Sequence, residues 1–326
     1  MTEMLRPPVV GEERITFPRT TGGPSRRRRI MTIAKARPWL LLTPALVVLA
    51  GLLLWPLIRV FLFSLQDYGL REIVSGDTNF IGFDNYAEIF GDAALWTVVL
   101  PNTIGFAIVA VAATVIFGTL VALLMASLGL FWRTIVGSAI MVAWAMPAVT
   151  GTYVWIWIFD ADRGLVNESL KGLGLMDQSF NWFTNQWTFY GIVALNIVHH
   201  GFPFVAITVL AGLLGVPKEM VEAAEMDGAG AFRRFFQIIF PTLKTVFGVV
   251  VILSTIWDFK VFAQIYLMPG GSGSNRQVLN LGVWSYVESF GQNRYGFGAA
   301  IAVLLTMLLL VITAIYVRTL FKEEKL

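Results

Sequence analysis

The 326-residue chain is 56% hydrophobic and only 14% charged, and its mean hydropathy is +0.71. Soluble domains carry about 25% charged residues, so the composition excludes an ordinary soluble domain and indicates a polytopic membrane protein. Cysteine is absent, which excludes a disulfide, a thiol nucleophile and a Cys-ligated metal site. The net charge of +3 is less informative than the places where the charges lie.

The first 30 residues are predicted to be a disordered, Arg-rich N-terminal segment on the cytoplasmic side, because they are rich in Pro, Gly and Thr and contain Arg26–Arg29. Four consecutive arginines could bind nucleic acid. Since an apolar run follows shortly, a topology anchor facing anionic lipid explains them better, and we expect no nucleic-acid partner. That apolar run is too long for a cleaved signal peptide and no small-residue cleavage site follows it.

Residues 31–326 are expected to form one transmembrane domain, an all-α fold with six membrane-spanning helices. Each uncharged run approaches the roughly 20 residues that a spanning helix needs, and no run shows the ten-residue alternation of a membrane barrel. Of the six runs, only the fifth is interrupted by charged residues, at Asp258 and Lys260. The spans are predicted at residues 38–58, 103–128, 134–159, 190–214, 245–268 and 295–317.

The distribution of Lys and Arg predicts the orientation. Six spans place both termini on one side, and that side carries 17 Lys and Arg against six on the other. Cytoplasmic loops carry the excess of basic residues, so both termini and the loop over residues 215–244 are predicted to be cytoplasmic.

An enzyme is the class that the sequence favours least. No GxxxxGK[ST] motif is present, so this chain has no phosphate-cradling loop for ATP. The histidines are His199 and His200, and neighbouring residues on a helix point about 100° apart, which makes them a poor metal pair. We therefore expect no catalytic residue, no metal and no cofactor in this chain.

The stretch EAAEMDGAGAFRRFFQIIFP, from Glu222 to Pro241, is unusual because the 40 residues over 178–217 carry no charge at all. Residues 218–226 predict a short helix, Gly228 and Gly230 predict a turn, and residues 231–240 predict a second helix. An interfacial helix lying on lipid is one interpretation. Alanine and glutamate argue against it, since such helices prefer basic and bulky apolar residues, so a cytoplasmic docking peg is favoured.

Glu222-Ala223-Ala224, then Asp227-Gly228-Ala229, Ile239 and Pro241, closely resemble the EAA loop of ABC importer permeases, with Phe240 in place of the usual leucine. The carbohydrate-uptake (maltose-permease-like) branch is the most similar. Residues 79–90, the run LPNTIGFAIVAV, the sequence GLVN at 164–167 and PGGSGSN at 269–275 resemble further segments of these permeases.

This resemblance implies a type I ABC importer permease in the bacterial plasma (inner) membrane. The EAA loop would be the coupling helix, with Glu222 as its charged anchor and Gly228 at its turn. The implied partners are a second homologous permease, two copies of a cytoplasmic ABC ATPase that binds ATP and Mg, an extracytoplasmic sugar-binding protein, membrane lipid and the sugar itself.

The fifth span places Ser254, Trp257, Asp258 and Val261 at helical spacing on one face. A mid-membrane charge costs about 2.5–3.5 kcal/mol, so Asp258 is expected to face a wet cavity or a partner. The alternative is that it lies near the outer interface and is simply solvated.

The maltodextrin permease that the chain resembles has sugar contacts at positions matching Ser254, Trp257, Asp258, Gly201 and Phe204. Asp258 stands where that permease has an amide, while Ile197 and Val261 replace polar contacts. Gly201 and Pro203 are predicted to break the fourth helix in mid-span. His200 could point into the pathway or bond a neighbouring helix.

Three functions compete. The first is the permease of a sugar importer, most similar to the trehalose importers of actinobacteria; import of glycerol phosphate would favour basic groups over Asp258. The second is an ion-coupled secondary transporter, for which no duplicated half is visible. The third is a membrane scaffold whose EAA loop binds a cytoplasmic protein. Dependence on ATP separates the first from the others.

Overall fold

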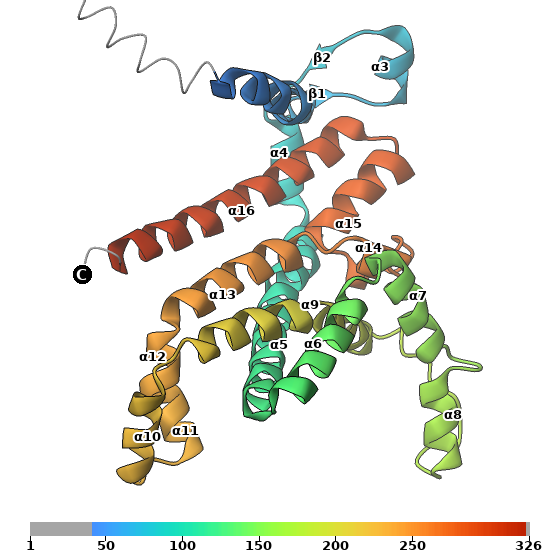
Figure 1. Cartoon of the computed structure of the whole chain (residues 1–326). Helices are drawn as coiled ribbons and strands as arrows, with labels where there is room; N and C mark the ends of the chain where they lie inside the picture. Colours follow the sequence, from blue (N-terminus) through green and yellow to red (C-terminus); the bar gives the residue numbers. More distant parts are fainter. Residues whose placement is uncertain (1–40, 324–326) are drawn as a thin grey trace, which may run out of the picture. The chain divides into compact units, whose positions relative to one another are not determined.

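The computed structural model describes residues 41–323, with side chains through Arg318. The predicted N-terminal segment and the start of the first predicted span lie outside the described residues. Within the described residues, the chain up to Leu57 and the chain from Ile58 belong to two separate units, and all packing described below lies within the second unit. Within the described range the chain is helical apart from turns, loops and two short strands (Figure 1).

The elements in chain order, with η for π-helical or 3-10 turns, are η1 (Ala50–Leu54), α2 (Trp55–Ser64), β1 (Gln66–Asp67), α3 (Leu70–Ser75), β2 (Asn79–Phe80), α4 (Asp84–Gly91), η2 (Leu95–Val99), α5 (Leu100–Ser127), α6 (Leu130–Trp144), α7 (Ala148–Ile158), α8 (Leu165–Gly172), α9 (Gln186–Leu214), α10 (Lys218–Met226), α11 (Ala231–Arg234), η3 (Phe235–Ile239), α12 (Phe240–Thr242), α13 (Lys244–Phe259), α14 (Ala263–Leu267), η4 (Arg276–Val278), α15 (Leu281–Tyr286), η5 (Val287–Gly291) and α16 (Tyr295–Glu323). Strands β1 and β2 pair antiparallel, with Gln66 opposite Phe80.

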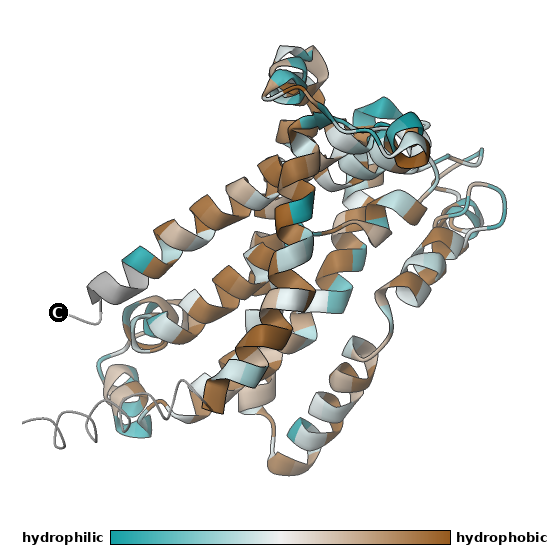
Figure 2. Ribbon diagram, turned by 90° about the horizontal axis from the view of Figure 1, so that it is seen from above, coloured by the Kyte–Doolittle hydropathy of each residue, from teal (hydrophilic) through white to brown (hydrophobic). Residues whose placement is uncertain are grey.

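Among the described residues, four helices are long and apolar enough to cross a membrane by length and composition: Leu41–Ser64, Leu95–Ser127, Gln186–Leu214 and Tyr295–Arg318. The number rises to six if each of two bent helix pairs counts as one span. The long helices are hydrophobic over most of their length, and hydrophilic residues gather at their ends and in the loops (Figure 2). The prediction of an all-α membrane fold is confirmed.

The third predicted span is not a single helix. Its two halves, α6 and α7, are bent by 92° at the break between Trp144 and Ala148. Pro147 explains the break, because proline lacks an N–H and disfavours helical geometry in the residue before it.

The fifth predicted span is also divided. Helix α13 ends at Phe259, and α14 begins only at Ala263. The backbone carbonyl of Val261 accepts a hydrogen bond of 3.0 Å from Nδ2 of the buried Asn280, which supplies a side-chain partner where helical bonding stops. At its other end α13 is bent by 81° from the helical stretch Ala231–Thr242.

The prediction that Gly201 and Pro203 break the fourth span is wrong. Helix α9 runs unbroken from Gln186 to Leu214 with Pro203 inside it. Gly201 instead lies where α9 packs against α5. A Cβ built on Gly201 would lie 2.9 Å from Cγ2 of Thr114, and one on Gly118 would lie 2.5 Å from Cβ of Val205. Glycine is required on each helix so that the two backbones can approach closely.

Buried amides connect the segments that follow the spans. Nδ2 of Asn102, in α5, donates to the carbonyls of Gln277 and Leu279, both at 2.9 Å. Nδ2 of Asn85, in α4, donates to the carbonyls of Ser64 and Gln66, both at 3.0 Å. Each amide thus satisfies backbone carbonyls of a distant segment that lack helical partners.

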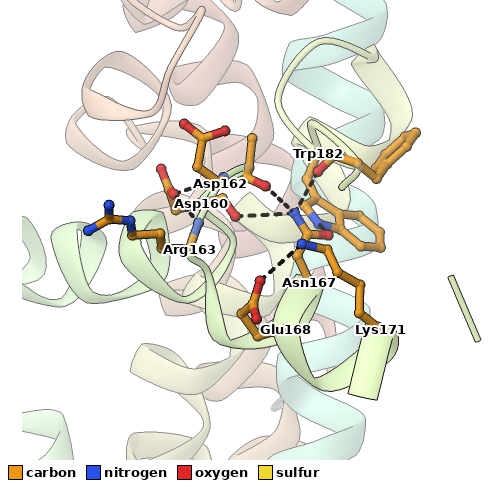
Figure 3. Close-up of polar contacts among 9 residues, drawn as sticks. Asp160, Asp162, Arg163, Asn167, Glu168, Lys171 and Trp182 are labelled. Atoms are coloured by element: carbon orange, nitrogen blue, oxygen red, sulfur yellow. Dashed lines mark hydrogen bonds and ion pairs between the residues drawn. The ribbon is translucent and has the colours of Figure 1, made fainter. Parts of the chain in front are cut away.

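Asn167 makes the same kind of connection at the start of α8. Its Nδ2 donates to the carbonyls of Asp160, Ala161 and Phe180, and its Oδ1 accepts from Nε1 of Trp182 at 3.0 Å (Figure 3). The amide nitrogen and the amide oxygen of Asn167 thus both have hydrogen-bond partners, and the residue is 1% exposed. The GLVN sequence is therefore a structural junction between two loops.

The close packing of α5 on α9 makes a stability prediction. Gly118→Ala should lower the unfolding midpoint of the purified protein in detergent, because overpacking costs about 1–3 kcal/mol. Gly105→Ala is the matched control on the same helix, since a Cβ there meets no atom within 4 Å. Equal midpoints for the two variants would contradict this account of the interface.

Candidate functional site

The EAA sequence forms an exposed helical hairpin. Helix α10 has the predicted bounds Lys218–Met226, and the second helical stretch continues from Ala231 through Thr242. Figure 1 shows α10 and α11 side by side, following α9 and preceding α12 and α13. The second stretch extends two residues past the predicted end, because the chain stays helical through Pro241 and Thr242 after the π-helical turn η3.

The turn of this hairpin depends on Gly228. Its φ of 75° lies in the left-handed region, which other residues adopt only with strain. The carboxylate of Glu225 forms an ion pair with the guanidinium of Arg234, which joins the two helices. Gly230 is extended with φ of −65°, and a Cβ there would meet no atom within 4 Å.

The EAA side chains are available for contact with another protein. Glu222, Ala223, Asp227 and Gly228 are exposed, and Ala224 is half-buried. Two large apolar side chains of the hairpin are also exposed, Met226 at 88% and Phe232 at 77%. Large exposed apolar side chains among charged ones are typical of a protein-binding surface.

A second group of candidate residues gathers where α9, α13 and the end of α6 meet. The rings of Phe204 and Trp257 are 4.9 Å apart at an angle of 69°, and Trp144 stacks with Phe204 with centroids 6.5 Å apart. Trp257 is 40% exposed. These three rings form an aromatic surface from three separate helices, which we call the aromatic cluster.

Ser254 and Asp258 lie beside Trp257 on the buried side of α13. Ser254 is 3% exposed and Asp258 is 7% exposed. Within the described residues, Oδ2 of Asp258 has no hydrogen-bond partner. A buried carboxylate oxygen without a partner is costly, which makes Asp258 a candidate binding residue.

The remaining candidate residues fall elsewhere. Val261 follows the end of α13 and is buried, so it does not share the helical face predicted for it. Ile197 belongs to the hydrophobic core. Gly201 faces Thr114 of α5, as described above. His200 is partly buried on α9, while the ring of the neighbouring His199 lies 6.0 Å from that of Trp155.

Trp144 was not predicted from the sequence. The sequence did hold a signal for it. Trp144 lies in the middle of the predicted span 134–159, three residues before Pro147, whereas tryptophans that anchor a span at the membrane surface lie at its ends. Among the residues that the structure describes, no three His, Asp or Glu side chains gather in a way that could hold a metal ion.

The fold is that of known ABC importer subunits. A bacterial ABC transporter that imports the acidic polysaccharide alginate matches with a TM-score of 0.74 at 18% identity, covering 90% of this chain and 98% of that one. The same kind of transporter in complex with an alginate pentasaccharide-bound periplasmic protein matches with a TM-score of 0.71 at 18% identity, covering 86% of this chain and 93% of that one. At 18% identity the similarity concerns the fold alone, which is that of a type I ABC importer permease.

Sequence comparison then assigns the family. Residues 115–323 match the family described as the binding-protein-dependent transport system inner membrane component, and the chain belongs to it. The diacetylchitobiose uptake system permease protein DasB of Streptomyces coelicolor is 38% identical over 94% of this chain and 92% of the relative. The trehalose transport system permease protein SugA of Mycobacterium tuberculosis is 30% identical over 86% of this chain and 87% of the relative.

The left-handed turn of the hairpin makes a prediction. Gly228→Ala should loosen the turn, because a residue with a Cβ is strained by about 1–2 kcal/mol in left-handed geometry. Limited proteolysis of the purified chain should then cut faster between α10 and α11. Gly230→Ala is the matched control, and cleavage at the same rate in both variants would contradict the assignment of strain to Gly228.

Proposed function

We propose that the chain is one permease subunit of an ATP-driven importer that carries a sugar, of disaccharide size, into the cytoplasm. The observation that carries the proposal is the exposed EAA hairpin in a chain of this family. A hairpin held between two long helices and joined by an ion pair is suited to transmit movement from a cytoplasmic motor.

The connections on both sides of the hairpin are short and well packed. Residues 215–217 alone separate α9 from α10. Leu210, Leu243 and Phe247 form a buried cluster against which Phe235 and Ile239 pack. Since cores are close-packed and transmit strain, displacement of α10 is expected to move α9 and α13 together.

Both helices carry residues of the proposed sugar site. The aromatic cluster offers ring faces on which the C–H side of a sugar can pack, and Asp258, one turn after Ser254, offers an acceptor for a hydroxyl. Movement of the hairpin would therefore change the position of Phe204 on α9 relative to Trp257 on α13. This is the proposed coupling between the motor and the sugar site.

The proposed assembly has a second homologous permease, two copies of an ABC ATPase and an extracytoplasmic sugar-binding protein. Both termini and the hairpin face the cytoplasm of a bacterial cell, as the distribution of Lys and Arg indicates. ATP and Mg bind to the ATPase chains. The family of this chain supports the dependence on a binding protein.

For the substrate, the names of the relatives favour carbohydrates. The 38% identical relative is named for diacetylchitobiose and the 30% identical one for trehalose, and a 29% identical relative from Thermococcus litoralis is named for trehalose and maltose. We propose a disaccharide, with diacetylchitobiose and trehalose as the first two sugars to test.

Charge reversal at the hairpin tests the coupling. Glu222→Lys should leave the protein in the membrane and abolish ATP-driven sugar uptake, since breaking one partner of an interfacial charge pair costs about 2–5 kcal/mol. Glu219→Lys makes the same change one turn earlier, outside the EAA residues, and should retain most uptake. Normal uptake by Glu222→Lys would contradict the docking role.

Removal of the buried carboxylate tests the sugar site. Asp258→Asn keeps the shape of the side chain and should raise the sugar concentration for half-maximal uptake about tenfold, because a hydrogen bond to a charged group contributes about 1.5–3 kcal/mol. The maximal rate and the membrane content of the protein serve as internal controls. An unchanged half-maximal concentration would remove Asp258 from the sugar site.

A further inference from the structure

The carboxylate of Asp258 lies on the side of α13 that packs inside the helix bundle. Four of the buried residues of α13 recur at helical spacing: Phe247, Val250, Ser254 and Asp258. Phe247 and Val250 belong to a core cluster that also contains Val205 of α9. Asp258 therefore continues the face of α13 that is turned toward α9.

Within the described residues, the carboxylate of Asp258 has no counter-charge. It forms no ion pair there, and its Oδ2 has no hydrogen-bond partner. The nearest basic residue along the chain, Lys260, lies beyond the end of α13 and is exposed. Because a buried charge is costly unless it is paired, a cation is the ligand group that this carboxylate suits best.

The aromatic cluster lies next to the carboxylate. Trp257 directly precedes Asp258 in α13, and its ring is 4.9 Å from that of Phe204 of α9. Trp257 is 40% exposed, so part of its indole ring is free to contact a ligand. The face of an aromatic ring attracts a cation, and the face of tryptophan does so most strongly. A carboxylate and an indole side by side are groups that recognise an organic ammonium.

We propose that this site prefers a sugar that carries a protonated amino group, such as a disaccharide of glucosamine, to the same sugar without the charge. The ammonium pairs with Asp258, and the C–H side of the sugar ring packs on Trp257. A hydroxyl only donates a hydrogen bond to the carboxylate, whereas an ammonium also neutralises its charge. This inference rests on the proposed function, which supplies the sugar, and adds the charge that the sugar carries.

Three disaccharides with the same backbone and linkage isolate the charge. Cellobiose, chitobiose and diacetylchitobiose differ only in the group at the second carbon of each ring, which is a hydroxyl, an ammonium and a neutral acetamide. Their dissociation constants are measured by calorimetric titration of the full chain with the chains that copurify, in nanodiscs, without the sugar-binding protein and at a pH that keeps the amine protonated. Chitobiose should bind about tenfold more tightly than either neutral sugar, since hydrogen bonds to charged groups contribute more than neutral ones.

Substitutions at Asp258 test the origin of the preference. In Asp258→Asn, chitobiose and cellobiose should bind equally, whereas Asp258→Glu keeps the charge and should keep the preference. Asp67→Asn is the matched control, because Asp67 is an exposed carboxylate of β1 and its loss should leave the preference unchanged. Each result is a ratio of two sugars within one variant, so a partial loss of folded protein does not alter it.

Equal binding of the three sugars by the wild type would overturn the proposal, as expected if the carboxyl group is protonated or is paired with a residue of the second permease. A preference that persists in Asp258→Asn would overturn the role of Asp258. ATP-driven uptake of cellobiose and diacetylchitobiose is measured on the same assembly with its binding protein present. Failure of sugar transport is thereby distinguished from failure of the preference for an amine.

Discussion

The close contact between α5 and α9 is the constraint on which the rest of the second unit depends. Gly118 accepts Val205 against its backbone, and Gly201 accepts Thr114 in the same way on the opposite helix. In a membrane, association between helices relies on such close packing because lipid is as apolar as the side chains. Helix α13 packs against both helices, and this places Trp257 against Phe204.

Side-chain amides fix the connections at the helix ends. Asn85, Asn102, Asn167 and Asn280 each donate to backbone carbonyls that helix geometry leaves without partners. Unsatisfied backbone groups are expensive near the membrane. Asn85, Asn102 and Asn167 lie within segments that resemble sugar permeases. Part of that resemblance therefore reflects folding and not transport.

Much of the fold could be predicted because it follows from composition and local signals. The uncharged runs located the spans, and Pro217, Gly228 and the run of good helix formers fixed α10 to the residue. The breaks inside spans were harder. Pro147 interrupts a helix while Pro203 does not, and the difference depends on packing: Pro203 is buried within a long helix held against α5. The end of α13 depends on Asn280, which lies far along the chain.

The candidate sites also divide into features that follow from local sequence and features that depend on contacts between distant segments. Spacing along one helix predicted that Ser254 and Asp258 share a face, and both are buried. Spacing could not bring Trp144 to Phe204, because that contact joins α6 to α9, and the two residues are far apart in the sequence. The apolar groove between residues 231–241 and the helices α5, α13 and α16 was also not predicted from the sequence, since its walls come from four separate segments.

The most direct test of the central claim is uptake of labelled diacetylchitobiose and trehalose by vesicles that contain this chain with the chains that copurify with it. The account predicts uptake of a disaccharide that requires ATP and a sugar-binding protein and that persists when the proton gradient is dissipated. Uptake driven by a proton gradient without ATP, or no ATP-dependent uptake of any sugar by an intact assembly, would contradict it.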